Sequence, residues 1–305
     1  MKPLVPKFVW FDGKFVRDSQ AQVSVMTHAI HYGTSVFEGL RGYWNSRNLH
    51  IFRLNDHIKR FRNSGKVYSI SLRFTDKQIA DAVTGLCRKN KVRESCYIRP
   101  FYFVGRYGIN LHVTEDSPTH AAIAMFPFGD LFSKNGISAG TSSWRRIHDT
   151  STPPLAKMGG NYLNSILATQ ECKRNGYDEA ILLDQLGNIS EAPGENIFIL
   201  RDGRLLTPPN SSSALEGITK DSVIEIAKDL GYKTVEREIP RTEAYFSDEV
   251  FLTGTAAEIT PITSIDGKKI GSGKVGNVTR QIRQNYSDIA MGRIKKYSHW
   301  ITPVY

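Results

Sequence analysis

The chain of 305 residues contains few cysteines, which limits the classes of protein to which it can belong. Its three cysteines, Cys87, Cys96 and Cys172, lie far apart and form no Cys-x-x-Cys pair. Neither a metal cluster nor a disulfide framework is therefore predicted. Unpaired cysteines fit a reducing compartment, so we expect a cytoplasmic protein without a bound metal.

Long hydrophobic runs are also missing from the sequence. No stretch reaches the roughly 18 apolar residues of a membrane-spanning helix. The first seven residues, Met1-Lys2-Pro3-Leu4-Val5-Pro6-Lys7, have neither the apolar core nor the small-residue cleavage site of a secretory signal. We therefore expect no membrane partner.

Basic residues are in excess, and the net charge of +10 raises the question of a polyanionic partner. The basic residues are dispersed, however, and the densest run, Lys59-Arg60-Phe61-Arg62, lies in an amphipathic segment that is typical of a solvated helix face. No zinc-finger spacing or RNA-binding aromatic motif accompanies them. We expect no nucleic-acid partner. A basic nucleic-acid-binding protein remains the alternative from a different class, and it predicts a colourless protein with salt-dependent DNA binding.

Short strands alternate with helices in both halves of the chain, which predicts an α/β (α+β) fold of two domains. Residues 128–136 break the pattern and form the predicted connection between a smaller domain, 1–127, and a larger one, 137–305. We expect helices at 55–67, capped by Asn55 or Asp56, at 76–89, capped by Thr75, and at 162–174, 218–230 and 275–293. We expect hairpins at 8–16 and 265–270 and strands at 23–25, 97–104, 121–128, 137–143, 180–184, 197–201 and 248–253.

The most informative stretch of the sequence lies between Lys157 and Asn196. Lys157 precedes two glycines, Tyr162 follows within one short loop, and Glu191 comes after an apolar strand and a turn. A pyridoxal phosphate enzyme needs these three groups: an amine for the Schiff base, a donor for the ring hydroxyl and an acid at the ring nitrogen. Their order predicts that pyridoxal 5′-phosphate is the cofactor.

Two segments have the character of an anion site. Residues 211–219 lead directly into a helix, whose first turn offers free N–H groups, and Thr219 adds a hydroxyl. The small residues Gly254-Thr255-Ala256-Ala257 close a strand and also expose N–H groups. Arg60 and Arg146 are the arginines that could supply charge to a phosphate.

Several motifs together resemble branched-chain aminotransferases, which are class IV aminotransferases of pyridoxal phosphate fold type IV. The similarity runs in the right order through nearly the whole chain, and this makes it highly specific. The motifs are His31-Tyr32-Gly33-Thr34-Ser35-Val36-Phe37-Glu38-Gly39, Tyr97-Ile98-Arg99-Pro100, Lys157-Met158-Gly159-Gly160-Asn161-Tyr162, Gly194-Glu195-Asn196-Ile197-Phe198, Gly217-Ile218-Thr219 and Gly254-Thr255-Ala256-Ala257-Glu258-Ile259.

The resemblance implies a role for each candidate residue. Lys157 would form the Schiff base and carry the proton, Tyr162 would pair with the ring O3′ and Glu191 with the pyridinium nitrogen. The implied phosphate ligands are Arg60, the backbone of Ile218 and Thr219, and Thr255, with Arg146 nearby. The implied substrate residues are Tyr97, Thr255 and Ala256 for the α-carboxylate and Phe37, Gly39 and Tyr162 for the side chain.

The resemblance also implies two half-reactions at one site, in which an L-branched-chain amino acid (leucine, isoleucine or valine) gives its amino group to the cofactor and 2-oxoglutarate then accepts it to become glutamate. Arg99 suits a pocket that accepts both a branched apolar side chain and the side-chain carboxylate of glutamate, because its guanidinium pairs with a carboxylate yet is weakly hydrated. Tyr32 and Leu111 would reach in from a second subunit, which implies at least a homodimer, with a hexamer as the larger alternative.

Other enzymes of the same fold share Lys157, Tyr162 and Glu191, namely D-amino acid transaminases, (R)-amine transaminases and aminodeoxychorismate lyase. Tyr97-Ile98-Arg99 and Gly254-Thr255-Ala256-Ala257 favour the L-branched-chain interpretation. Two features depart from the family pattern. Ala192-Pro193 precedes Gly194-Glu195-Asn196, and a lid-like loop carries the bulky pair Arg106-Tyr107.

Overall fold

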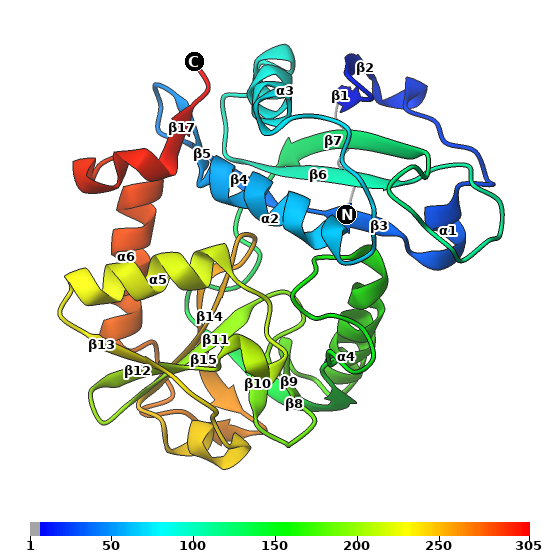
Figure 1. Ribbon diagram of the computed structural model, residues 1–305. Coiled ribbons are helices and arrows are strands. Elements are labelled where there is room, and N and C mark those ends of the chain that lie inside the picture. Colours follow the sequence, from blue (N-terminus) through cyan, green and yellow to red (C-terminus); the bar gives the residue numbers. More distant parts are fainter. Residues whose placement is uncertain (1–6) are drawn as a thin grey trace. The chain divides into compact units, whose positions relative to one another are not determined.

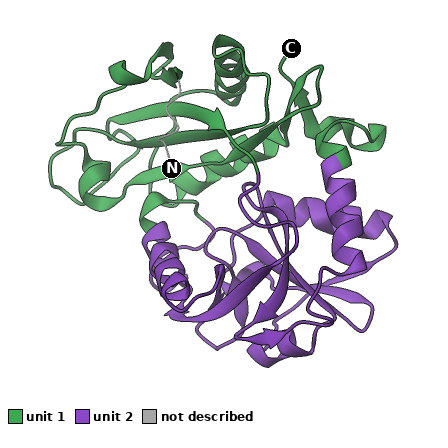
Figure 2. Ribbon diagram, turned by 180° about the vertical axis from the view of Figure 1, so that it is seen from behind, with its two compact units in different colours: residues 1–129, 156–160, 288–305 green, residues 130–155, 161–287 purple. Residues whose placement is uncertain are grey.

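The computed structural model describes residues 7–305, so the prediction made for the N-terminal stretch 1–6 lies outside the described residues. The chain forms two compact units (Figure 2). Unit 1 contains the residues up to Gly129 together with Ala156–Gly160 and Asp288–Tyr305, and unit 2 contains Asp130–Leu155 and Asn161–Ser287. The predicted domains were continuous, whereas the observed unit 1 is assembled from three pieces of the chain.

Within the described residues, unit 1 is built on an eight-stranded sheet with the strand order β17-β5-β4-β6-β7-β1-β2, and β3 also pairs with β6 (Figure 1). The pairs in this sheet are antiparallel. Its strands are β1 Phe8–Phe11, β2 Lys14–Arg17, β3 Ser35–Phe37, β4 Leu40–Trp44, β5 Leu49–Phe52, β6 Cys96–Val104, β7 Thr119–Pro127 and β17 Ile301–Pro303.

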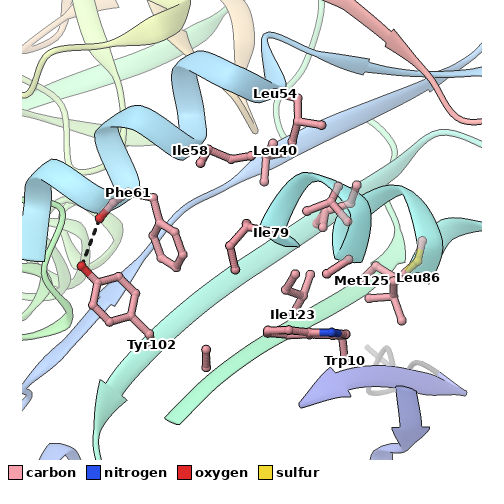
Figure 3. Packing of buried hydrophobic residues seen from close by; sticks show 14 of the residues in the cluster. Trp10, Leu40, Leu54, Ile58, Phe61, Ile79, Leu86, Tyr102, Ile123 and Met125 are labelled. Carbon is pink, nitrogen blue, oxygen red and sulfur yellow. Dashed lines mark hydrogen bonds between the residues drawn. The ribbon is translucent and has the colours of Figure 1, made fainter. Parts of the chain in front are cut away.

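Two amphipathic helices, α2 (Leu54–Lys66) and α3 (Asp76–Lys89), supply the core of unit 1 together with the sheet (Figure 3). Ile58 and Phe61 are buried on α2, and Ile79 and Leu86 are buried on α3. The Tyr102 hydroxyl of β6 donates a hydrogen bond to the Phe61 carbonyl over 3.2 Å, which ties α2 to the sheet.

Unit 2 contains a nine-stranded sheet with the strand order β10-β9-β8-β15-β14-β11-β12-β13, and β16 also pairs with β15. Its strands are β8 Ile137–Arg145, β9 Glu179–Leu183, β10 Ile189–Glu191, β11 Asn196–Arg201, β12 Arg204–Thr207, β13 Lys233–Glu236, β14 Glu249–Gly254, β15 Glu258–Ile265 and β16 Lys268–Lys269. The helices are α4 Tyr162–Arg174, α5 Ile218–Asp229 and α6 Asn277–Ala290, whose last residues belong to unit 1.

Most predicted elements agree with the structure. α3 and α4 have the predicted bounds, and the Thr75 hydroxyl accepts a hydrogen bond from the Gln78 N–H as a helix cap. The predicted cap of α2 was wrong, because this helix begins at Leu54, directly after Arg53 in a left-handed conformation (φ 49°). No described helix is both long and apolar enough to cross a lipid bilayer.

The strand predicted at Val23-Ser24-Val25 is also wrong. This segment is irregular and leads into the short helix α1 (His28–Tyr32), which ends at Gly33 with φ 67°. Val23 and Val25 are 45% and 79% exposed. The alternation of apolar and polar residues indicates a strand only where one face becomes buried, and here neither valine is buried.

Candidate active site

In unit 1, Lys157 lies on a segment that runs beside β3. Its N–H donates to the Ser64 hydroxyl over 3.0 Å, and its carbonyl accepts from the Phe37 N–H over 3.1 Å. A Cβ atom at Gly159 would lie 2.3 Å from the Ser35 hydroxyl. A glycine after the lysine is therefore needed for this close approach, which fixes the backbone of Lys157.

Unit 1 brings four of the predicted residues together: Lys157 and Arg99 lie beside the ring of Phe37, and Arg99 contacts Tyr97. The Lys157 Nζ atom is 4.9 Å from the centre of the Phe37 ring, and the Arg99 guanidinium is 4.6 Å from the same centre. Arg99 Nη2 also donates to the Tyr97 hydroxyl over 3.1 Å. The amine proposed for catalysis and the guanidinium proposed for specificity thus share a neighbour.

Gly39 belongs to the same group because of its contact with Tyr97. A Cβ atom at Gly39 would lie 1.8 Å from the Tyr97 hydroxyl oxygen, and the side chain of Tyr97 is buried. Only glycine leaves room for the phenol where it now lies. Gly39 therefore sets the position of a predicted carboxylate ligand.

We expect Gly39→Ala to raise the KM of every substrate, because the new methyl group displaces the Tyr97 phenol. A displacement of about 1 Å in a positioning group costs roughly 100-fold in kcat/KM. Steady-state kinetics measures this loss, and Gly194→Ala is the matched control, since a Cβ there meets no atom within 4 Å. Equal kinetics for Gly39→Ala and the wild type would contradict the assigned contact.

The predicted phosphate ligand Arg60 pairs with a buried carboxylate of unit 1. Arg60 Nε lies 2.6 Å from Glu38 Oε1, Arg60 Nη2 lies 2.8 Å from Glu38 Oε2, and His57 Nδ1 lies 2.8 Å from the same oxygen. Burial by itself would raise the pKa of Glu38, but the neighbouring Arg60 and His57 outweigh it and hold that pKa far below its usual range. Burial lowers the pKa of His57. Sequence reasoning missed Glu38 and His57, since their burial is a tertiary property.

Tyr32 and Leu111 lie on the surface of this single chain. Their exposed fractions are 43% and 74%, and the Tyr32 hydroxyl donates to the Ile109 carbonyl over 3.3 Å. The structure thus joins α1 to the loop that carries Leu111. Their predicted role in a second subunit stays a prediction.

In unit 2, Glu191 is buried at the end of β10 and held from three sides. Its Oε2 atom accepts from the Asn196 amide over 3.1 Å and from the Leu215 N–H over 3.0 Å. Its Oε1 atom lies 2.8 Å from Arg146 Nε in an ion pair. These contacts fix the direction of the carboxylate.

Arg146, which was predicted near the phosphate, forms an ion pair with Glu191, and its predicted place beside a phosphate stays a prediction. Its side chain is buried, and within residues 7–305 neither Nη1 nor Nε, which is close to Glu191 only as an ion pair, makes a hydrogen bond. A buried donor without a partner costs free energy, which is recovered when a ligand or water accepts its hydrogen bond. The arginine thus pairs with the predicted ring-nitrogen acid and keeps buried donors that a ligand or water can use.

Asn196 connects the predicted residues of unit 2. It stands opposite Thr253 of β14, and its amide donates both to Glu191 and to the Leu215 carbonyl. A Cβ atom at Gly217 would lie 1.8 Å from the Asn196 side-chain oxygen. One amide thereby joins the acid, the end of β14 and the segment before α5. The motif Gly194-Glu195-Asn196 pointed to this residue without revealing its contacts.

Tyr162 is the first residue of α4, and this helix is tied to the turn that follows Glu191. The Ser165 hydroxyl donates to the Pro193 carbonyl over 2.8 Å, and the Ala192 N–H donates to the Glu195 carbonyl over 2.8 Å. The turn uses the carbonyl of Pro193, and a proline supplies that group as well as any other residue. This departure from the family pattern is therefore compatible with an ordered turn.

The donors of unit 2 fit a phosphate monoester. α5 begins at Ile218 after Gly217, so the N–H groups of its first turn, including that of Thr219, have no partner inside the helix. Thr255, Ala256 and Ala257 form the turn between β14 and β15. Together with the acid Glu191 and the buried donor of Arg146, this set matches the phosphate and the ring nitrogen of pyridoxal 5′-phosphate.

Comparisons with known proteins identify the family. The model of the family described as Amino-transferase class IV matches residues 35–265 of the chain. The chain belongs to the class IV aminotransferases. The branched-chain-amino-acid aminotransferase of Salmonella typhimurium is 43% identical over 97% of both chains. The predicted family and the predicted enzyme class, an aminotransferase, are therefore confirmed.

Solved structures of class IV aminotransferases confirm the fold. The branched-chain aminotransferase of Thermoproteus uzoniensis with norvaline has a TM-score of 0.95 and 44% identity, covering 98% of this chain and 99% of that one. The branched-chain amino acid aminotransferase of Thermobaculum terrenum, in its PLP form (holo form), has a TM-score of 0.93 and 38% identity, covering 99% of this chain and 100% of that one. The α/β fold predicted from the sequence is thus correct.

Proposed function

We propose that this class IV aminotransferase moves the amino group between L-branched-chain amino acids and 2-oxoglutarate. The observation that carries the proposal is the shared aromatic neighbour of Lys157 and Arg99 in unit 1, the ring of Phe37 at 4.9 and 4.6 Å. An amine and a carboxylate-binding cation next to one apolar ring suit a substrate pocket for both leucine-like and glutamate-like chains.

The cofactor is pyridoxal 5′-phosphate, which, when bound, supplies a conjugated ring that takes up the electrons of the substrate Cα–H bond. The Lys157 amine removes the proton from the substrate Cα and returns a proton at the end of the step. Glu191, fixed by Arg146, Asn196 and the Leu215 N–H, holds a proton at the ring nitrogen. Tyr162 would donate to the ring O3′. The N–H groups of Ile218 and Thr219, with Thr255 and Arg60, would hold the phosphate.

The substrate is bound by its two ends. Tyr97 and the N–H groups of Thr255 and Ala256 bind the α-carboxylate and so orient the Cα–H bond toward Lys157. Phe37, Gly39 and Tyr162 surround the side chain, and Arg99 pairs with the distal carboxylate of 2-oxoglutarate. Arginine suits both tasks, because it binds a carboxylate with two donors and stacks on aromatic rings.

We propose that the enzyme is a homodimer at least, with the exposed Tyr32 and Leu111 completing the pocket of the other subunit. Size-exclusion chromatography with light scattering tests this assembly. We also propose a cytoplasmic location, which the three buried free thiols Cys87, Cys96 and Cys172 support.

A panel of amino donors tests the proposed function. L-leucine, D-alanine and (R)-1-phenylethylamine are assayed side by side with 2-oxoglutarate as the acceptor. We expect turnover with L-leucine and little with the other two. Faster turnover of D-alanine or of (R)-1-phenylethylamine than of L-leucine would contradict the proposal and indicate a D-amino acid or (R)-amine transaminase.

Arg99→Ala tests the dual pocket. The loss of a charge-assisted pair costs about 2 kcal/mol, so we expect kcat/KM for 2-oxoglutarate to fall roughly 30-fold. The value for 2-oxo-4-methylpentanoate should change less than about threefold, because its apolar chain makes no ion pair. Single-turnover kinetics with each oxo acid provides the measurement. An equal loss on both would argue against the dual pocket.

A further inference from the structure

The two-residue link between β3 and β4, which both pair with β6, joins the predicted substrate residues to the predicted phosphate arginine. Glu38 lies between Phe37 and Gly39, and its N–H donates to the Pro100 carbonyl over 2.8 Å, which holds this link on β6. From this position its side chain reaches Arg60 on α2. The Glu38 carboxylate therefore contacts helix α2. The substrate-binding roles proposed for its neighbours Phe37 and Gly39 do not explain this contact.

The pairing of Glu38 with Arg60 is bidentate and buried. Each carboxylate oxygen takes one nitrogen of the guanidinium, at 2.6 and 2.8 Å, and the two side chains are 1% and 12% exposed. A planar guanidinium held by two parallel contacts has one orientation, so the direction of its remaining N–H groups is set as well.

His57 and Gly39 hold the carboxylate itself. An ionised carboxylate only accepts hydrogen bonds, so His57 donates from Nδ1 to Oε2 over 2.8 Å, and the Gly39 N–H donates to the same oxygen over 3.2 Å. A buried ion pair is weak support for stability, since an apolar pair of the same volume does as well or better. A positional role explains why this group is present in the core.

We propose that Glu38, held by His57, is a positioning residue that fixes the guanidinium of Arg60 for the phosphate of pyridoxal 5′-phosphate. The proposal rests on the proposed function, in which Arg60 is a phosphate ligand. Glu38 itself touches neither the cofactor nor the substrate. Its effect is to remove the rotational freedom of Arg60 before the phosphate arrives, which favours binding of the phosphorylated cofactor.

The test compares two forms of the cofactor that differ only in the phosphate. The full chain is freed of cofactor and titrated with pyridoxal 5′-phosphate or with pyridoxal, and the dissociation constants are read from the change in tryptophan fluorescence. We expect Glu38→Gln to weaken binding of pyridoxal 5′-phosphate by about 10- to 100-fold, the value of one charge-assisted contact. Binding of pyridoxal should change less than about threefold.

Two further variants make the result specific. Glu243→Gln is the matched control, because Glu243 also forms a two-point pair with an arginine, Arg237, in unit 2. It should leave the ratio of the two affinities unchanged. If Glu38→Gln does not fold, Glu38→Asp takes its place, since the shorter side chain keeps the charge but cannot reach both nitrogens of Arg60.

Arg60→Met separates the inference from the proposed function. With Arg60 absent, Glu38→Gln should cause no further change in the affinity ratio. A wild-type ratio in Glu38→Gln, or equal weakening of both ligands, overturns the positioning role if Arg60→Met lowers the ratio. A wild-type ratio in Arg60→Met overturns instead the assignment of Arg60 as a phosphate ligand, and the inference falls with it.

Discussion

Lys157→Ala is expected to abolish transamination, with kcat at least about 10⁴-fold below the wild type. In the proposed reaction the Lys157 amine moves the proton at the substrate Cα, and no other lysine lies on the segment Ala156–Gly160. We expect the purified wild type to be yellow because of the bond between lysine and cofactor, and this colour should be absent from the variant. Activity and the visible absorption spectrum are the two measurements.

A chemical rescue serves as the control for Lys157→Ala. Added methylamine should restore part of the turnover, since a small free amine can enter the space of the missing side chain and move the same proton. The variant should melt at the temperature of the wild type, because the backbone contacts of residue 157 with Ser64 and Phe37 do not depend on its side chain. Full activity without an added amine would end the proposal.

Glu191→Gln is expected to lower kcat by about 10²- to 10³-fold, the usual loss when one fixed electrostatic partner of a reacting group is removed. A glutamine keeps the shape but not the charge that Arg146 faces at 2.8 Å and that the ring nitrogen requires. The rate of a single half-reaction with L-leucine measures the change without interference from product release.

The neighbouring Glu195 provides the matched control for Glu191. It is a buried glutamate on the same turn, and it has no assigned contact with the cofactor. Glu195→Gln should reduce the rate by less than about threefold. Similar losses in both variants would indicate damage to the turn and would remove the special role of Glu191.

Much of the fold followed from local sequence signals. α3 carries its own cap in Thr75 and Gln78, and α4 follows directly from the lysine loop, so both bounds were predictable. The strand prediction for Val23-Ser24-Val25 was wrong because the alternation of apolar and polar residues does not show whether a partner strand exists. The two returns of the chain to unit 1, at 156–160 and 288–305, have no local signal at all.

The candidate site was predicted as a set of residue types and motifs, and the contacts between them were not. Lys157, Tyr162 and Glu191 stood out because their chemistry is rare in that order. The ion pair of Arg146 with Glu191 joins residues from different parts of unit 2, and the pair of Arg60 with Glu38 joins helix α2 to the link between β3 and β4. Such pairs form only when burial makes an unpaired charge costly, and burial is decided by the whole fold.

The pairing of β17 with β5 has a consequence for synthesis of the protein on the ribosome. β17 covers the edge of β5 through the pairs of Ile301 with Phe52 and Thr302 with Ile51, and Val304 is buried in the core of unit 1. β5 and β17 are far apart in the sequence, so this edge of β5 stays open during synthesis until β17 has emerged from the ribosome, and an open strand edge invites pairing with other nascent chains. Deleting residues 301–305 should thus lower the soluble yield in cells more than any change at the active site does.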